Sequence, residues 1–323
     1  MLDEPLETKK FILEIGTKAD RLDKILAKLL PDYSRSRVQD WIECGHVSVN
    51  GKSPNESKVR QIVGPLDEIE VCIQPDEHTK AFQPEQIDFQ VLEESKEWIV
   101  IGKPAGLVTH PGAGNWSGTL LNGLLFKFPE LSYVPRAGIV HRLDKDTSGI
   151  LVVARTEAAQ LDFVKQLQSR TMGRSYIAIV SGCTSDSGSI TDDIGRDPRN
   201  PIKMASIKQS NPIAPKEART HFTTLSRAEF DGKNFSLLLC KLETGRTHQI
   251  RVHLSSINHP LLGDSLYGGP DLKNFSNLRQ MLHAYKLEFN DPKGGNRLAF
   301  TCEIDKDMRE VMNNIFGEVE IKL

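Results

Sequence analysis

Residues 75–86, PDEHTKAFQPEQ, are polar, contain two prolines and separate two stretches with different hydrophobic patterns. A stretch of this composition predicts a linker, so the chain should fold around two separate cores. Its length of 323 residues agrees with about two domains. We therefore expect a flexible tail at 1–16, an N-terminal domain at 17–76, a linker at 77–87 and a larger domain at 88–323.

The N-terminal domain begins with two predicted helices. Leucine and isoleucine residues recur at helical spacing from Ala19 to Leu30, and Pro31 ends that helix. Ser34 is a suitable N-cap for a second helix, and Gly45 stands where a helix C-terminus favours glycine.

Two short strands are predicted after the helices. Apolar and polar residues alternate at 47–49 and again at 69–73, and Asn50-Gly51 signals a hairpin turn. The N-terminal domain should therefore be a small α/β module.

The larger domain is rich in strand-like runs, which fall at 98–101, 150–153, 176–180 and 237–242. The strongest helix follows Thr156 and stops near Gly173, with Leu161, Val164 and Leu167 predicted to face inward. Strands and helices do not alternate regularly, so we expect a mixed α+β domain and not a doubly wound one.

Composition excludes several classes of protein. With 41 Lys+Arg and 43 Asp+Glu the formal net charge is −2, so any binding of nucleic acid must use local patches. The apolar runs are far shorter than the roughly 20 residues of a membrane-spanning helix. The start, MLDEPLETKK, does not resemble a signal peptide. Five widely spaced cysteines without a CxxC pair predict no disulfide framework and no metal site, and favour a cytoplasmic location.

The most unusual segment is 138–149, GIVHRLDKDTSG, which is strongly polar between two apolar stretches. Burying such a segment costs desolvation energy unless it has a function. A local turn, in which Asp146, Thr147 and Ser148 bond their own backbone, would explain its second half. That interpretation leaves the preceding residues, 141–144, unexplained.

One alternative comes from the same segment. Residues 144–147 fit DxDxT, the phosphotransfer loop of haloacid-dehalogenase-like phosphatases, which follows an unbroken apolar strand and uses further acids to hold magnesium. Here His141 and Arg142 interrupt the strand, and Asp264 is the one later acid that suits the pattern. The chain also lacks GxxxxGK[ST], GxGxxG, GxSxG and HExxH motifs, so nucleotide, dinucleotide, serine-hydrolase and zincin chemistry lose their usual support.

Residues 135–155, PRAGIVHRLDKDTSGILVVAR, resemble the catalytic motif of the large family of pseudouridine synthases that modify ribosomal and transfer RNA. Residues 19–52 resemble an S4 RNA-binding domain, and the whole resemblance covers 17 to about 305. Arg174 is a small departure, because many relatives have lysine there. Further segments resemble the family's other motifs in order; they are 103–106 with 110–111, 174–182, 245–253, and 259–264 with 266–268 and 282–284.

The resemblance implies a cofactor-free and metal-free enzyme with a mixed, mostly antiparallel sheet in its catalytic domain. It implies that Asp144 acts on the nucleoside, on either the ribose or the uracil ring. Arg251 would pair with this carboxylate, although an ordinary phosphate contact is an alternative role. Tyr176 would stack on the target uracil, and Arg142 would fill the gap that a flipped base leaves. His141 would serve as a structural residue or a phosphate contact.

RNA contacts are expected on both domains. In the larger domain, residues 163–185 and 196–219 are locally basic. The expected partner is large-subunit ribosomal RNA or an assembling large subunit, bound by a monomer without a membrane. Another ribosomal RNA loop, a transfer RNA, or a non-catalytic role as an assembly factor are the alternatives. The candidate S4 contacts are Arg21, Lys24, Arg35, Arg37 and Lys52.

Overall fold

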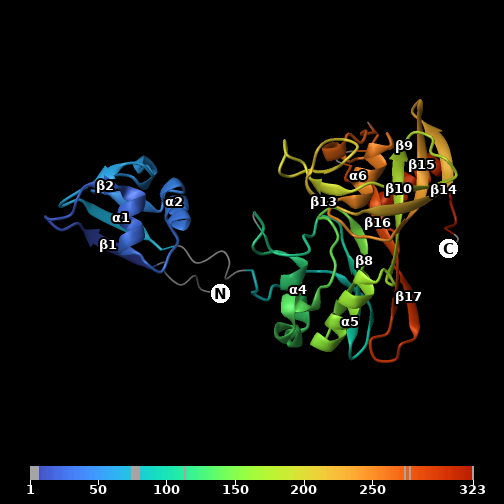
Figure 1. Cartoon of the computed structure of the whole chain (residues 1–323), viewed down its shortest axis with the longest axis horizontal. Coiled ribbons are helices and arrows are strands. Elements are labelled where there is room, and N and C mark those ends of the chain that lie inside the picture. Colours follow the sequence, from blue (N-terminus) through green and yellow to red (C-terminus); the bar gives the residue numbers. More distant parts are fainter. Residues whose placement is uncertain (1–6, 74–80, 113, 273, 276–277, 322–323) are drawn as a thin grey trace. The chain divides into compact units, whose positions relative to one another are not determined.

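The computed structural model describes residues 7–73, 81–112, 114–272, 274–275 and 278–321. The chain divides into two compact units, Met1–Thr79 and Lys80–Leu323 (Figure 1). Among the described residues, no helix combines the length and the apolar character that a membrane crossing requires. All five cysteines are free thiols.

The two predicted helices of the N-terminal unit are confirmed as α1 (Leu22–Leu29) and α2 (Arg35–Glu43). The Ser34 side chain accepts a hydrogen bond from the Arg37 amide at 3.3 Å, which caps α2 as its sequence indicates. Gly45 follows α2 with a φ of +74°, a conformation that glycine adopts without steric cost.

Two antiparallel strand sets complete this unit, and leucine, isoleucine, valine and Trp41 side chains form its core. Asn50 and Gly51 both have positive φ, so the predicted turn is present. It does not join its two strands directly, because the chain passes through a 3-10 turn and another strand before it returns. The strands are β1 (Thr8–Ile12), β5 (Glu68–Cys72) and β3 (Val47–Val49) in one sheet, and β2 (Asp20–Arg21) with β4 (Ile62–Val63) in the other.

The prediction of a flexible tail at 1–16 is wrong where the structure describes it. Residues 8–12 form β1, which pairs with β5 from Thr8↔Cys72 to Ile12↔Glu68. The ordering has a simple cause, since Phe11 and Leu13 pack against the core while Lys10 on the other face of this edge strand is exposed to water.

The larger unit contains a nine-stranded sheet among its described residues, which confirms the predicted mixed, mostly antiparallel α+β fold. Only the β16–β8 pair is parallel in the strand pairing described. A separate three-stranded sheet consists of β12 (Met204–Ser206), β11 (Ile194–Arg196) and β13 (Ile213–Lys216). The strands of the large sheet are, in order, β10 (Ser187–Thr191), β14 (Arg219–Phe230), β15 (Lys233–Leu242), β9 (Gly173–Ser181), β16 (Leu282–Asn290), β8 (Ser148–Ala154), β7 (Trp98–Lys103) and β6 (Gln90–Glu94), with β17 (Arg297–Thr301) beside β16.

Both faces of this sheet are buried. Strand β9 shows this by alternation, since Tyr176 and Ala178 point into one core while Ile177 and Ile179 point into the other. The first core also receives side chains from α4 (Leu120–Lys127), α5 (Glu157–Gln168) and α6 (Gln249–Ser256), and the second is covered by α7 (Lys306–Phe316). In Figure 1, α4 and α5 lie near β8, and α6 lies nearer to β13.

The predicted linker at 77–87 is partly structured. Its first residues, 77–80, lie outside the described part of the chain. Ala81 is buried, and the Asn122 amide on α4 donates to the carbonyls of Ala81 at 3.4 Å and Gln83 at 2.8 Å. Glu85 accepts from the Gly118 amide at 3.0 Å. A buried side-chain amide therefore satisfies backbone groups that composition alone assigns to solvent.

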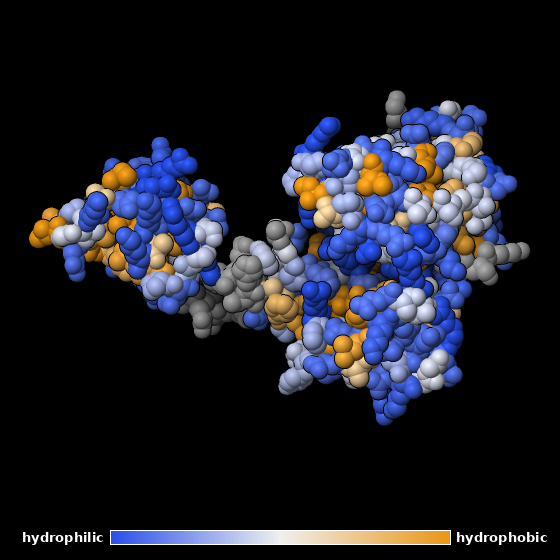
Figure 2. All heavy atoms as spheres, in the orientation of Figure 1, coloured by the Kyte–Doolittle hydropathy of each residue, from blue (hydrophilic) through white to orange (hydrophobic). Residues whose placement is uncertain are grey.

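Helix α5 begins after Thr156 as predicted, with Thr156 as its N-cap, and Leu167 packs against the core, but the predicted inward face is wrong for Leu161 and Val164. Phe163 is fully buried and packs edge-on against Phe289, whereas Leu161 is 64% exposed. Val164 and Leu167 line a large cavity that is described below. Apolar side chains are visible at the surface over α4 and α5 in Figure 2. The helix thus uses one aromatic side chain as its anchor and presents aliphatic residues to the cavity and to solvent.

This assignment of the helix faces predicts different effects of two substitutions. Phe163→Ala should lower the free energy of unfolding of the larger unit by about 3–5 kcal/mol, because it leaves a core cavity. Leu161→Ala, the matched control on the same helix, should change it by less than about 0.5 kcal/mol. Urea unfolding measures both values, and equal losses would contradict the assignment.

Candidate active site and RNA-binding surface

The polar loop that carries Asp144 is fixed at both ends by close backbone contacts. At Gly138, with φ +74°, a Cβ atom would lie 1.8 Å from the Ala154 carbonyl oxygen. At Gly149, with φ +115°, it would lie 2.2 Å from the Ala284 carbonyl oxygen. Each site therefore requires glycine, which accounts for a glycine at each end of the motif. Because both ends are held against strands of the sheet, the loop between them has little freedom.

Arg251 lies between two carboxylates. Its Nε and Nη2 donate to Asp264 at 2.7 and 2.9 Å, and its Nη1 donates to Asp144 at 3.1 Å. Burial alone would lower the pKa of Arg251, but the two carboxylates raise it well above its ordinary value. Asp264 is almost fully buried, so the two-point contact fixes the plane of the guanidinium and directs its third nitrogen at Asp144.

Aromatic and imidazole groups surround this pair. The Arg251 guanidinium lies 5.1 Å from the centre of the Tyr267 ring, a cation–π distance. The Tyr267 hydroxyl bonds His248 Nδ1 at 2.8 Å and accepts from the Met204 amide at 2.9 Å. Burial raises the pKa of Tyr267 to about 12, so this phenol stays neutral near pH 7. His248 Nε2 lies 3.9 Å from Asp144.

Tyr176 lies on β9 and faces the same recess as Asp144 and Arg251. This recess, of about 50 Å³, is also lined by Leu282 and Arg142. Burial raises the pKa of the Tyr176 phenol, Arg174 opposes the shift and the Asp144 charge adds to it. A neutral aromatic ring therefore stands beside the carboxylate, as a stacking role requires.

The recess adjoins a cavity of about 660 Å³, a volume within the usual range of ligand sites. Arg174 is 7% exposed, and among the described residues no ion pair joins it to a carboxylate; its Nε has no hydrogen-bond partner there, and its Nη2 reaches the Glu243 carbonyl at 3.5 Å. Glycine at position 245 is what makes room for the Arg174 guanidinium. The cavity is strongly cationic, since it is lined by Arg136, Arg142, Arg170, Arg174 and Arg246 but only by Asp144 and Glu243 among acids.

His141 and Arg142 have different surroundings. His141 Nε2 accepts a hydrogen bond from the Val152 amide at 3.3 Å, and burial together with the Arg174 charge lowers its pKa to about 3. A neutral, backbone-bonded imidazole fits the predicted structural role and not that of a charged phosphate contact. Arg142 is exposed and lines both the cavity and the recess.

The arginines at the cavity rim are held by acids. Arg170 pairs with Glu217 at 2.6 Å and with Glu243 at 3.5 Å. Glu243 also bonds His221 at 2.6 Å and pairs with Arg219 at 3.5 Å. Part of the local positive charge that the sequence indicates is therefore compensated within the protein.

Two of the candidate S4 contacts, Arg21 and Arg35, bind the same carboxylate, that of Asp23. Asp23 is fully buried and accepts from Arg21 at 3.0 Å, from Arg35 at 2.7 Å and from Gln39 at 2.6 Å. Lys24 pairs with Asp20. Arg21 and Arg35 are thus oriented side chains, which the charge count of this region does not reveal.

The two remaining S4 candidates are placed differently. The Arg37 guanidinium lies 5.2 and 5.3 Å from the Tyr33 and Trp41 rings. Lys52 is exposed just after the Asn50-Gly51 turn.

A metal-dependent phosphatase finds no support in the geometry. In the described residues there is no group of three His, Cys, Asp or Glu side chains placed to hold a metal ion. Asp144 lies in a loop that precedes β8, and its carboxylate bonds an arginine.

The sequence indicated Asp264 only as part of a motif and as the later acid of the phosphatase alternative, and its contact with Arg251 was not predicted. Its place in a motif thirteen residues after Arg251 was the available signal. Arg279, which contacts the catalytic loop, carried no recognisable signal.

The family described as RNA pseudouridylate synthase matches residues 97–256, and the S4 domain matches residues 20–58. Among solved structures, human RNA Pseudouridylate Synthase Domain Containing 1 shares the fold, with a TM-score of 0.57 and 24% identity over 78% of this chain and 94% of that one. The family matches, together with a fold that agrees with them, thus place the chain in the class of RNA pseudouridine synthases that carry an S4 domain.

Relatives of known name indicate which members of this class the chain is most similar to. Ribosomal large subunit pseudouridine synthase D of Neisseria meningitidis serogroup B is 48% identical over 91% of this chain and 78% of the relative. The protein of the same name from Yersinia pestis is 41% identical over 93% of this chain and 92% of the relative. The chain belongs to the RNA pseudouridine synthase family, and both of these relatives bear the name ribosomal large subunit pseudouridine synthase D.

The buried Asp23 predicts a specific pH dependence. Burial raises its pKa, but bonds from Gln39, Arg35 and Arg21 outweigh this and lower it from 3.8 to about 2. A lowered pKa stabilises the folded state by about 2 kcal/mol above pH 4, and this contribution is lost as the pH falls through about 2.

Asp23→Asn should therefore destabilise the N-terminal unit by about 2 kcal/mol near pH 7 and by progressively less below pH 4. The fluorescence of Trp41 during unfolding, with Trp98 and Trp116 replaced by phenylalanine, reports on this unit. A difference from wild type that does not change between pH 7 and pH 2 would contradict the prediction.

Proposed function

We propose that this enzyme converts uridines of large-subunit ribosomal RNA into pseudouridine, with Asp144 as the carboxylate that acts on the nucleoside. The observation that carries the proposal is the position of Asp144, in a recess beside Tyr176 and bonded to Arg251. The names of the relatives support the choice of RNA. We further propose that the enzyme acts as a monomer in the cytoplasm, on free RNA or on the assembling subunit.

The reaction breaks the C1′–N1 bond of uridine and forms a C1′–C5 bond. The proton at C5 leaves, and N1 ends with a proton, so atoms balance without a donor or an oxidant. Asp144 assists by attack at the ribose or at the uracil ring. Arg251 orients the carboxylate through a charge-assisted hydrogen bond, and the neutral Tyr176 ring stacks on the uracil while it is detached.

The target base must leave its stack before it can reach Asp144, which costs a few kcal/mol. Arg142 is suited to fill the vacated position, because it is exposed and lines both the recess and the cavity. The cavity arginines would hold the RNA backbone on either side of the flipped nucleotide. Arg174 is the best candidate for a phosphate contact among them, since a buried guanidinium without a carboxylate favours an anion.

The S4 unit would add affinity for structured RNA through oriented arginines. Two other readings remain distinguishable by experiment. A different RNA substrate would preserve the chemistry and change only the RNA that reacts. A non-catalytic assembly factor would bind RNA and release nothing from it, yet the Asp264–Arg251–Asp144 arrangement has no use in a protein that only binds.

Tritium release tests the proposal. Large-subunit ribosomal RNA is transcribed with uridine tritiated at C5 and mixed with the enzyme in excess chelator, beside the Asp144→Asn variant. The wild type should release tritium, and Asp144→Asn should be slower by at least about 10⁴-fold because it lacks the carboxyl group that acts on the nucleoside.

Each contrary result has a defined meaning. Equal release by the two proteins would overturn the role of Asp144. No release by the wild type from free RNA or from assembling subunits, with tight binding retained, would overturn the enzymatic proposal in favour of the assembly factor. Transfer RNA prepared in the same way is the control for substrate choice.

A further inference from the structure

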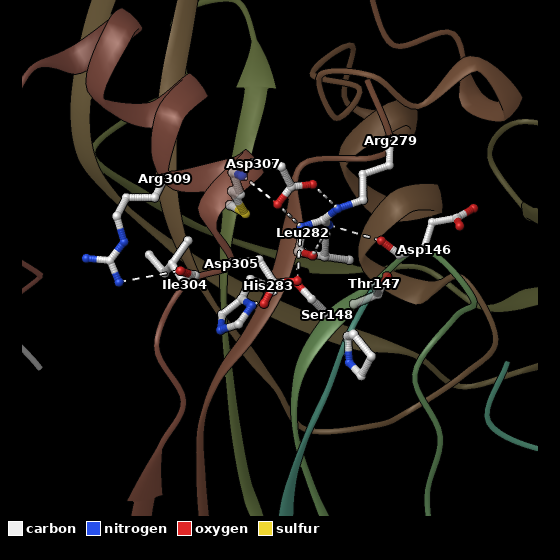
Figure 3. Close-up of polar contacts among 12 residues, drawn as sticks. Asp146, Thr147, Ser148, Arg279, Leu282, His283, Ile304, Asp305, Asp307 and Arg309 are labelled. Atoms are coloured by element: carbon white, nitrogen blue, oxygen red, sulfur yellow. Dashed lines mark hydrogen bonds and ion pairs between the residues drawn. The ribbon is translucent and has the colours of Figure 1, made fainter. Parts of the chain in front are cut away.

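The catalytic loop is bound by an arginine that lines neither the cavity nor the recess. Arg279 Nη1 donates to the carbonyl oxygen of Asp146 at 3.0 Å, and its Nη2 donates to Ser148 Oγ at 3.1 Å. Figure 3 shows the guanidinium beside Asp146, Thr147 and Ser148. These contacts begin two residues after Asp144, so they act on the same short loop.

The opposite side of the guanidinium is held by α7. Asp307 at the start of that helix accepts from Arg279 Nε at 2.7 Å and from Nη2 at 3.0 Å. Nη1 also donates to the carbonyl oxygens of Gln280 and Leu282, each at 3.2 Å. The two-point contact with Asp307 fixes the plane of the guanidinium, and every nitrogen of Arg279 has a partner.

Neighbouring groups bind the same loop. Ser148 Oγ is 2.8 Å from His283 Nδ1, and the Gln280 amide donates to Thr147 Oγ1 at 3.3 Å. The loop therefore rests on a buried polar frame, and Arg279 is the member of that frame that links it to α7.

Asp144 depends on this support, because its own side chain has few restraints. Its carboxylate has one close protein contact among those described, the 3.1 Å bond from Arg251. Where it points is thus set by this one bond together with the backbone that carries Asp144. A displacement of about 1 Å in a reacting group can cost about 100-fold in rate.

We propose that Arg279 is a positioning residue for Asp144, and that Asp307 on α7 orients Arg279 for that role. The inference rests on the proposed function of Asp144. It assigns to the C-terminal helix a part in the reaction, although no residue of that helix lines the recess.

The test measures the single-turnover rate constant for tritium release at saturating enzyme, together with the dissociation constant for the same RNA. Arg279→Ala should lower the rate constant about 100-fold and leave the dissociation constant within about twofold. Guanidinium ion at non-denaturing concentration should restore part of the rate, and sodium chloride at equal ionic strength should not. A purely structural role would not give this rescue.

Arg309→Ala is the matched control. Arg309 lies on α7, the helix that also carries Asp307. It contacts Glu303 and the Ile304 carbonyl and makes no described contact with the loop that carries Asp144 (Figure 3). Its rate constant should equal that of the wild type. If it falls as far as that of Arg279→Ala, the effect comes from loss of the helix and the inference is overturned.

Asp307→Asn is the second test variant, and it replaces Arg279→Ala if that protein does not fold. It keeps one acceptor oxygen for Arg279. It should lower the rate constant about tenfold, and guanidinium should not restore it because the Arg279 site is filled. A rate constant within twofold of wild type for the folded variants would overturn the inference. Asp144→Asn measured alongside separates the outcomes. If that variant is fully active, the proposed role of Asp144 fails and the inference fails with it. If it is inactive while the Arg279 and Asp307 variants stay active, only the role of Arg279 is rejected.

Discussion

The guanidinium of Arg251 lies between Asp264 and Asp144, and the rest of the site is arranged around that contact. Two carboxylates on one guanidinium would be costly to bury if either lost its partner. Asp264 accepts from two nitrogens of Arg251, Nε and Nη2, which leaves Nη1 to bond Asp144. That bond goes to one oxygen of Asp144, so Arg251 does not occupy the other oxygen. The arrangement orients the Asp144 carboxylate in the recess through a charge-assisted hydrogen bond.

Each part of the fold brings a component of this contact into place. Asp144 and Arg251 are 107 residues apart in the chain. The loop before β8 supplies the first, and α6 supplies the second. Strand β9 contributes Tyr176 from the face of the sheet that also carries the α4, α5 and α6 core. Arg279 then connects the loop that carries Asp144 to α7, because it donates to the Asp146 carbonyl and to the Asp307 carboxylate.

Much of the fold was predictable because its elements carry local signals. Ser34 and Thr156 are strong N-caps, and the four predicted strand runs are buried. Strand β1 was missed because it is short and its polar and apolar residues do not alternate: Lys9 lies on the half-buried face and the apolar Ile12 on the exposed one. The face of α5 was missed because counting aliphatic residues overlooks a single aromatic anchor, Phe163.

The site was predictable to the extent that its residues lie in motifs. Asp144, Tyr176 and Arg251 were found from such motifs, and the structure brings them to one recess. The pairing of Arg21 and Arg35 with Asp23 depends on three-dimensional contacts, as does the position of Arg279. No spacing in the sequence predicts which acid a given arginine will bind.

The most direct test of this account is the single-turnover rate constant of Arg251→Gln, measured with RNA binding and combined with Asp144→Asn in a double variant. If Arg251 acts through Asp144, the rate constant should fall by more than about 100-fold with little change in RNA affinity. The double variant should then be no slower than Asp144→Asn alone. If Arg251→Gln instead weakens RNA binding and leaves the rate constant unchanged, Arg251 is a phosphate contact and the account of the site is wrong.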